Sequence, residues 1–124
     1  MAKLHGALDK AVDRKGWLLG LDGRRLPIRS KHSALNTLLQ GAGGAVAKTW
    51  MVYANRMVAE DLPPGVAQQL AYVHDELQWQ VRPEYTDQLK DILTRAAAQA
   101  GEDLGFRLPV DIGLDTGSSW AETH

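Results

Sequence analysis

The tripeptide His74-Asp75-Glu76 holds the residue types in this chain that are best suited to chemistry. It stands between two apolar runs with period-two alternation, and this pattern predicts a β-hairpin over residues 70–82 with the tripeptide at its tip. Two adjacent carboxylates suit Mg²⁺, which takes few protein carboxylates and keeps water or substrate phosphates as its other ligands. Because strand side chains alternate in direction, one carboxylate is expected to be the direct ligand, Asp75, with Glu76 beside it. An isolated His-Asp-Glu is more often a solvated turn, so the motif needs support from elsewhere in the chain.

That support comes from two side-chain amides upstream. Asn36 and Gln40 lie four residues apart and therefore on one face of a helix. Amides both donate and accept hydrogen bonds, so they suit the minor-groove edge of DNA, where every base pair presents acceptors in similar places. The alternative is that both amides only form hydrogen bonds within a helix–helix interface, and the spacing alone favours it.

A run of basic residues precedes the amide pair. Such a run suits contacts to nucleic-acid phosphates, although a short basic run is more often a solvated surface. Its members are Arg24, Arg25, Arg29, Lys31 and His32.

Composition and charge are those of an ordinary globular chain. Of 124 residues, 44% are hydrophobic and 23% charged, and cysteine is absent, which excludes disulfides and thiolate metal sites. The net charge of −1 conceals a basic start, with eight Lys/Arg and three Asp/Glu in residues 1–35, and an acidic remainder, with six and twelve. Such a division suits a protein that holds phosphate with one part and cations with another, but chance asymmetry explains it equally well. No signal peptide or bilayer-spanning run is present, so a cytoplasmic protein without membrane contact is expected.

The elements that must position these residues follow from periodicity. Helical spacing of apolar residues predicts helices over about residues 2–15, 32–60 and 84–100. Hairpins are predicted over 17–29 and 70–82, and a terminal strand over 108–115. Together these predict an α+β fold: one small antiparallel sheet packed on one long and two shorter helices, in a single partial domain over residues 1–124.

Glycines and turns refine these predictions. Gly16 and Gly101 are expected to cap the first and third helices. Asp22-Gly23 predicts a tight turn in which both residues take positive φ. The glycines at 41, 43 and 44 lie inside the long helix, where they predict close approach of another backbone.

The second hairpin is expected to turn at Asp75-Glu76. That turn would place six side chains on one apolar face: Leu70, Tyr72, His74, Leu77, Trp79 and Val81. Asp-Glu is not a favoured pair for a tight turn, and a local rule broken at one spot often marks function.

The chain resembles the family A DNA polymerases, of the bacterial polymerase I and phage replicase type. The motifs stand in the family's order and at similar spacing over essentially the whole chain. They are Gly16-Trp17, Gly20-Leu-Asp-Gly-Arg24, His32-Ser-Ala-Leu-Asn-Thr-Leu-Leu-Gln40, Val73-His-Asp-Glu-Leu-Gln78, Leu114-Asp-Thr116 and Trp120-Ala-Glu-Thr-His124.

The resemblance implies that the chain is the C-terminal part of a polymerase palm. Asp75 would be one of two catalytic metal aspartates, with Glu76 supporting the site and His74 near the primer terminus. Asn36 and Gln40 match the amide pair that contacts the minor groove, and His32 matches a basic DNA-contacting position. The complete enzyme would use two Mg²⁺ ions, primer–template DNA and dNTP. The ending resembles the family's C-terminus, so the chain is expected to be complete there.

One part of the family pattern is missing. The sequence contains no Asp-x-Ser-x-x-Glu, the motif with the other metal aspartate, and Lys48 has no Arg four residues before it, as the fingers helix requires. A single carboxylate motif cannot build a two-ion clamp. The chain alone is therefore expected not to polymerise DNA. It is expected to be an excised C-terminal piece, a remnant, or a split-gene product that assembles with a partner carrying the missing fingers, first palm motif and thumb.

Two other functions remain open from sequence. One is a stand-alone DNA-binding module that keeps the amide pair and the basic run. The other is an interaction domain that self-associates or docks on another subunit through a sheet edge. For these two functions, as for the polymerase, the resemblance implies a location in the cytoplasm of a bacterial or phage-infected cell.

Overall fold

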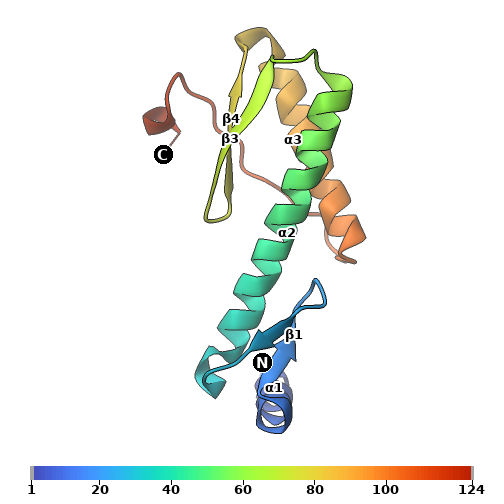
Figure 1. The fold of residues 1–124 in the computed structure, drawn as a ribbon, viewed down its shortest axis with the longest axis vertical. Helices are drawn as coiled ribbons and strands as arrows, with labels where there is room; N and C mark the ends of the chain where they lie inside the picture. The colour runs from blue at the N-terminus through green and yellow to red at the C-terminus, as the bar shows by residue number, and fades with distance from the viewer. Residues whose placement is uncertain (1, 124) are drawn as a thin grey trace. The chain divides into compact units, whose positions relative to one another are not determined.

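The structure is a computed structural model that describes residues 2–123, and it confirms an α+β fold with three helices and small antiparallel sheets (Figure 1). The helices and strands are α1 (Ala2–Lys15), β1 (Trp17–Leu19), β2 (Arg25–Pro27), α2 (Lys31–Asp61), β3 (Ala67–Val73), β4 (Glu76–Val81) and α3 (Thr86–Asp103). Short 3₁₀ turns occupy Pro83–Tyr85 and Trp120–Glu122. No helix within the described residues is long and apolar enough to cross a bilayer.

The chain divides into two compact units. The first comprises Met1–Thr49 with His74–Glu76, and the second comprises Trp50–Val73 with Leu77–His124. Each unit contains one hairpin, β1–β2 or β3–β4, and each hairpin is a separate two-stranded sheet. The prediction of one shared sheet was therefore wrong. Each hairpin instead covers its apolar residues with helix, so neither needs the other as a neighbour.

The core of the first unit joins α1, the β1–β2 hairpin and the start of α2. Leu8, Leu18 and Ala34 are buried together, one from each element. Gly16 ends α1 as predicted, with φ of 71° and its N–H donating to the Val12 carbonyl at 2.7 Å.

The β1–β2 turn is wider than the sequence predicted. Gly23 has φ of 80°, whereas Asp22 does not take positive φ. The Gly20 N–H donates to the Arg24 carbonyl at 2.8 Å, which closes a loop rather than a two-residue turn. The reason is local: the Asp22 carboxylate accepts from the Arg24 backbone N–H at 3.2 Å and from its Nε at 2.5 Å, which holds the loop open.

Only one of the three α2 glycines permits a close approach. A Cβ at Gly41 would lie 3.0 Å from Leu26 Cδ1, so β2 packs there directly against the helix backbone. Gly43 and Gly44 have nothing within 4 Å of such a Cβ, and for them the prediction was wrong.

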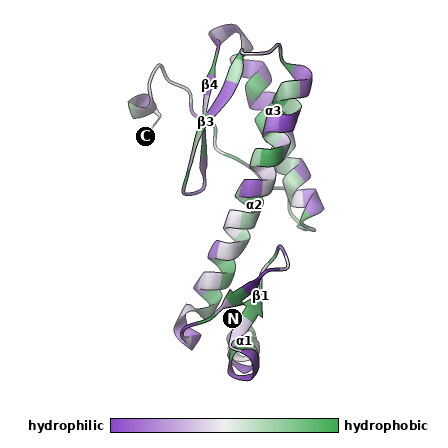
Figure 2. Cartoon of the chain, in the orientation of Figure 1, coloured by the Kyte–Doolittle hydropathy of each residue, from purple (hydrophilic) through white to green (hydrophobic). Residues whose placement is uncertain are grey.

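The second unit is built on the end of α2, on β3–β4 and on α3. Ala54 of α2 is buried with Leu89, Leu93 and Ala96 of α3, and the Trp50 Nε1–H donates to the Leu93 carbonyl at 2.9 Å. Hydrophobic and hydrophilic residues alternate around α3 (Figure 2), as expected of a helix with one face in a core.

Helix α3 passes through Gly101 and ends later than predicted. Its C-cap is Leu104, followed by Gly105 with φ of 73°. The Phe106 N–H donates to the Gly101 carbonyl at 2.9 Å and the Gly105 N–H to the Glu102 carbonyl at 3.0 Å, which is the Schellman arrangement. Gly101 has another purpose: a Cβ there would lie 2.6 Å from Val110 Cγ2. Close packing, not capping, requires this glycine.

The β3–β4 hairpin turns one residue earlier than predicted. The turn residues are His74 and Asp75, and Glu76 is the first residue of β4. The packing shows which residues share a face, because side chains alternate along a strand. Ala67 packs in the same core as Trp79 and Val81, which puts Leu70 on the opposite face of β3, where it is 59% exposed. The predicted shared face was therefore wrong.

The predicted terminal strand is not formed. Residues 108–115 are assigned neither strand nor helix. Their alternation has a different cause, because Ile112 and Leu114 pack on the core around Ala54 while the residues between them are exposed. An extended segment lying on a core repeats with period two without hydrogen bonding in a sheet.

Candidate functional site

The tripeptide predicted to bind metal lies at the tip of the β3–β4 hairpin. His74, Asp75 and Glu76 are all exposed. His74 has φ of 57° and is the one non-glycine with positive φ among the described residues. A residue with a Cβ pays about 1–2 kcal/mol for a left-handed conformation, and such strained residues cluster at functional sites.

The amide pair lies on the exposed side of the first half of α2. Asn36 and Gln40 are exposed, as is His32 one turn before them, while Ala34 behind them is only 1% exposed. Neither amide is held in a helix–helix contact, since no side-chain hydrogen bond engages Asn36 or Gln40 within residues 2–123. The alternative of a buried amide pair is therefore wrong.

The turn and the amide pair belong to the same compact unit. His74–Glu76 group with Met1–Thr49, although the strands on either side of the turn belong to the second unit. The predicted metal motif is thus grouped in the same unit as the half of α2 that bears His32, Asn36 and Gln40.

A test of whether Mg²⁺ fits must start from the ligands present. An exposed aspartate on a turn suits Mg²⁺, which binds one or two protein carboxylates and retains waters. Among residues 2–123, no group of three or more His, Asp or Glu side chains is placed to hold a metal ion. Asp75 therefore fits as one ligand, and a two-ion centre would need carboxylates from another chain or segment.

The members of the basic run differ in their surroundings. Lys31 Nζ lies 2.7 Å from the Asp13 carboxylate, and this hydrogen bond raises the pKa of Lys31. Arg24 pairs with Asp22, as described above. Arg25 instead lies over the ring of Trp17, with 4.8 Å from its Cζ to the ring centroid. Arg29 and His32 are exposed.

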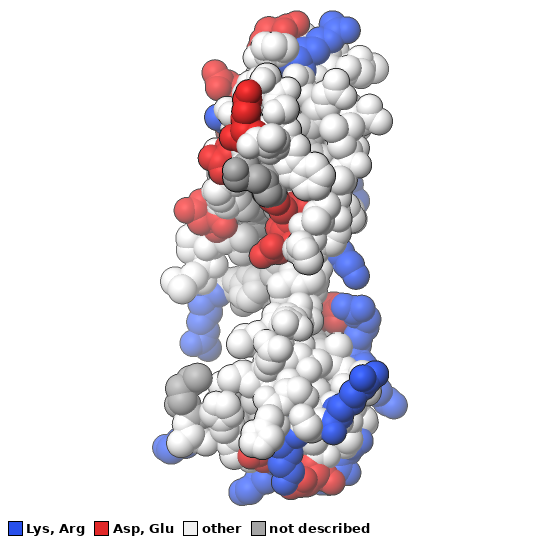
Figure 3. Space-filling view, turned by 90° about the vertical axis from the view of Figure 1, so that its left-hand side faces the viewer, with Lys and Arg blue, Asp and Glu red and all other residues white. Residues whose placement is uncertain are grey.

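Charge is segregated between the units. On the face shown in Figure 3, Lys and Arg gather over the first unit, and Asp and Glu are prominent over the second. The first unit, with its basic run, thus has the surface on which an anion would be held.

Sequence reasoning missed two features of possible function. Trp17 is only partly buried, and Lys15 and Arg25 lie over its ring. Strand alternation could have found this, because it places Trp17 and Arg25 on one face of the hairpin. The second feature is Glu122, whose carboxylate accepts from the Ser118 N–H at 2.6 Å and from its hydroxyl at 2.9 Å, which lowers the pKa of Glu122.

Residues 118–122 fold around that carboxylate. Trp120 is 54% exposed beside it. The predicted motif that ends at His124 extends beyond the described residues.

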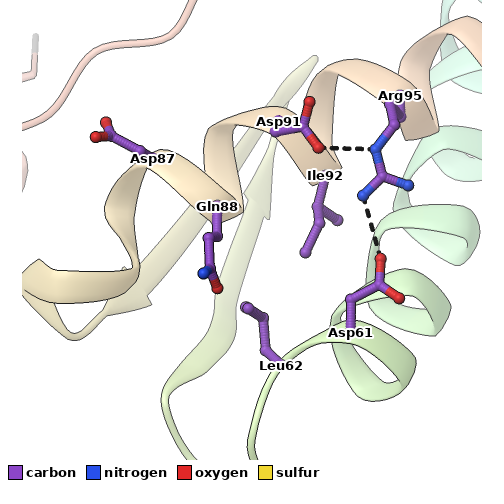
Figure 4. Close-up of a pocket in the computed structure, with 7 residues that line it drawn as sticks. All are labelled: Asp61, Leu62, Asp87, Gln88, Asp91, Ile92 and Arg95. Carbon is purple, nitrogen blue, oxygen red and sulfur yellow. Dashed lines mark hydrogen bonds and ion pairs between the residues drawn. The ribbon is translucent and has the colours of Figure 1, made fainter.

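A cleft of about 470 Å³ lies in the second unit, away from every predicted site residue (Figure 4). Arg95 of α3 spans it, with 2.8 Å from Nε to Asp91 and 3.1 Å from Nη2 to Asp61 of α2. Leu62 and Ile92 form its apolar part. Arg95 pairs with two of the three carboxylates that line it, Asp61 and Asp91, so the cleft is a structural junction between helices.

Comparison with known proteins gives three findings. The family described as DNA polymerase family A matches residues 1–122. The DNA-directed DNA polymerase of Enterobacteria phage T3 is 36% identical over 116 residues, covering 90% of this chain and 16% of that protein. That of Escherichia phage T7 is 36% identical over 119 residues, with the same shares.

A solved structure has the same fold. It is the POL domain of Pol1 from M. smegmatis in complex with DNA primer-template and dNTP, with a TM-score of 0.85 and 20% identity over 99% of this chain and 23% of that one. The chain therefore spans about a sixth of its phage relatives and under a quarter of this neighbour. By the match over residues 1–122, this chain belongs to DNA polymerase family A.

Proposed function

We propose that this chain is the C-terminal palm portion of a DNA-directed DNA polymerase that transfers nucleotides by a two-metal mechanism. The observation that carries the proposal is the exposed Asp75 turn, grouped in one unit with the exposed amide pair of α2, in a chain of this family. The M. smegmatis neighbour holds primer-template DNA and dNTP. We assign the same kinds of ligand to the complete enzyme here, in the cytoplasm of a bacterial or phage-infected cell.

Asp75 is assigned as a ligand of Mg²⁺. When bound, two such ions would stabilise the attacking and leaving oxygens of a phosphoryl transfer. Glu76 begins β4 beside Asp75, and its carboxylate supports the site. His74 fixes the backbone of the turn and faces the primer terminus. The backbone strain at His74 has a function in this proposal, because the turn orients Asp75 toward the reacting phosphate.

Asn36 and Gln40 are assigned to the minor groove of the primer–template. Their exposure and their spacing of one helical turn leave both amides available to base-edge acceptors. His32, Arg29, Lys31 and Arg25 contact phosphate. Reading the minor groove reports the geometry of correct pairing without reporting sequence, as template-directed synthesis requires.

The isolated chain is proposed to be inactive. It has one metal-binding carboxylate motif, and a two-ion site needs carboxylates from the first palm motif of a partner. A neighbouring reading frame that encodes Asp-x-Ser-x-x-Glu and the fingers helix would identify that partner.

The binding part of the proposal can be tested on the chain alone. We expect salt-dependent binding to a primer–template duplex, weakened about thirtyfold by Asn36→Ala with Gln40→Ala, since each of two hydrogen bonds is worth about 1 kcal/mol. Gln68→Ala with Gln80→Ala, which removes two exposed amides from β3 and β4, is the matched control. Equal effects of the two double variants would contradict the minor-groove role. Self-association without DNA binding would favour an interaction domain.

A further inference from the structure

The β1–β2 hairpin has a buried face and an exposed face. Its register pairs Trp17 with Pro27 and Leu19 with Arg25, so Trp17 and Arg25 are diagonal neighbours on one face. The other face bears Leu18, which is 6% exposed, and Leu26, which packs on Gly41. The face with Trp17 and Arg25 therefore points away from the core, and Leu19 on it is 60% exposed.

Two cations lie over the Trp17 ring. Lys15 Nζ is 5.0 Å from the ring centroid and Arg25 Cζ is 4.8 Å from it. Gly16, with φ of 71°, turns the chain between α1 and β1 and lets the last residue of α1 reach back to the ring. The indole thus gathers one side chain from the helix and one from the second strand.

These two cations lack the acidic partners that their neighbours have. Arg24 lies 2.5 Å from Asp22 and Lys31 2.7 Å from Asp13. In the part of the chain that the structure describes, no carboxylate lies within ion-pair distance of Lys15 or Arg25. Two like charges on one ring repel each other, and a bound anion removes that repulsion while the ring keeps both in place.

We propose that Lys15, Trp17 and Arg25 form a clamp for a backbone phosphate of the primer–template, with Trp17 as the positioning residue. The proposal rests on the proposed function for its ligand. Within the basic run, Arg25 joins Lys15 in holding this phosphate, whereas Arg24 and Lys31 each also pair with an aspartate, Asp22 and Asp13. An arginine fork and a lysine ammonium are complementary donors for the oxygens of one phosphate.

The test is binding of a fluorescent primer–template duplex to the whole chain at several salt concentrations. Lys15→Gln with Arg25→Gln should together reduce the slope of log K against log salt by about 0.9, the value for one phosphate. Trp17→Leu removes no charge, yet it should weaken binding about two- to fivefold, and Trp17→Phe should restore most of the loss. Lys90→Gln, which removes one positive charge from α3, should leave the slope unchanged.

A second titration separates the clamp from the proposed function. Inorganic pyrophosphate is added to ¹⁵N-labelled chain while the indole N–H of Trp17 is followed by NMR. A shift at Trp17 that Arg25→Gln abolishes supports the clamp even if the duplex does not bind, in which case only the polymerase function fails. The clamp is overturned if Trp17 does not respond, or if the Lys15, Arg25 and Lys90 variants bind the duplex alike.

Discussion

His74 takes a backbone conformation that most residues avoid, directly before the aspartate assigned to metal. Its φ of 57° stands out because the other positive-φ positions of the described chain are glycines. A glycine would satisfy this turn with less strain. The histidine therefore has a cost in stability, which a role for its imidazole near the primer terminus would justify.

Replacing His74 by glycine should stabilise the isolated chain. The variant relieves strain of about 1–2 kcal/mol, offset by the greater chain entropy of glycine, for a net gain of up to about 1 kcal/mol. Urea denaturation of the two proteins measures it. Asp75→Gly is the matched control, because Asp75 does not have positive φ and should gain nothing. Equal effects at the two positions would contradict the strain argument.

Single residues also show how far sequence reasoning reaches. That Asn36 and Gln40 share one helical face followed from their spacing of four residues. Their exposure did not follow, because the spacing alone favoured a helix–helix interface, and only the packing of α2 decided it. The choice between His74-Asp75 and Asp75-Glu76 as turn residues did not follow. The sequence preferences of tight turns concern Asn and Gly, and neither His74-Asp75 nor Asp75-Glu76 contains these residues. The packing of the hairpin therefore decided the register.

At the scale of elements, two glycines inside helices differ in the space around them. A Cβ at Gly101 of α3 would meet Val110 Cγ2 at 2.6 Å, whereas a Cβ at Gly44 of α2 would meet nothing within 4 Å. The sequence predicted the reverse, a helix cap at Gly101 and a close approach at Gly44. The contact that distinguishes them comes from a segment far along the chain.

Alanine at these positions should act in opposite directions. Gly101→Ala forces Val110 away and should destabilise the fold by about 1–3 kcal/mol. Gly44→Ala should stabilise it by up to about 1 kcal/mol through helix propensity. Thermal unfolding of both variants tests this, and Gly101→Ala with Val110→Ala should recover part of the loss. Stabilisation by Gly101→Ala alone would show that the contact is not tight.

The hydrogen bond between Tyr53 of α2 and Asp103 of α3 gives the second unit a defined pH dependence. Donation from Tyr53 lowers the pKa of Asp103, and the same bond raises the pKa of Tyr53. The contribution of Asp103 is present above its ordinary pKa of 3.8 and is lost as the pH falls through its lowered folded value. That of Tyr53 is present below 10.0 and is lost as the pH rises through its raised folded value.

Asp103→Asn should therefore destabilise the chain at neutral pH and lose its effect in strong acid. It should also return the pKa of Tyr53 toward 10.0, because the acceptor is no longer charged. Tyrosinate absorbance during alkaline titration and urea unfolding across pH measure the two effects. Gln99→Ala, which removes the other donor to Asp103, is the control and should leave the Tyr53 titration unchanged. An unshifted titration in Asp103→Asn would contradict the account.

Elements were predictable where one local period governs them, and not where distant packing does. The long helix, observed as Lys31–Asp61, was placed within a residue at each end because its apolar stripe is unbroken. The prediction of a terminal strand was wrong because an extended segment on a core shows the same period-two alternation of burial as a strand in a sheet. The predicted end of α3 was wrong because a glycine near the end of an apolar stripe, here Gly101, is typical of a helix C-cap.

At the scale of the whole molecule, the family supplies what local chemistry could not. Neither His-Asp-Glu nor a pair of amides identifies a polymerase alone, and both have ordinary structural explanations. Their joint order, with the match over residues 1–122, shows the family. The share of its phage relatives that the chain spans, 16%, leaves the metal site and the polymerase activity as proposals.

The central claim is that Asp75 is a catalytic metal ligand that needs a second carboxylate from outside this chain. The direct measurement is Mg²⁺-dependent primer extension by the chain alone and by a chimera in which it replaces the matching segment of the phage T7 polymerase. We predict no extension by the chain alone, extension by the chimera, and a loss of at least about a thousandfold in the chimera with Asp75→Asn, whereas Asp115→Asn should extend normally. Extension by the isolated chain, or an active Asp75→Asn chimera, would contradict the claim.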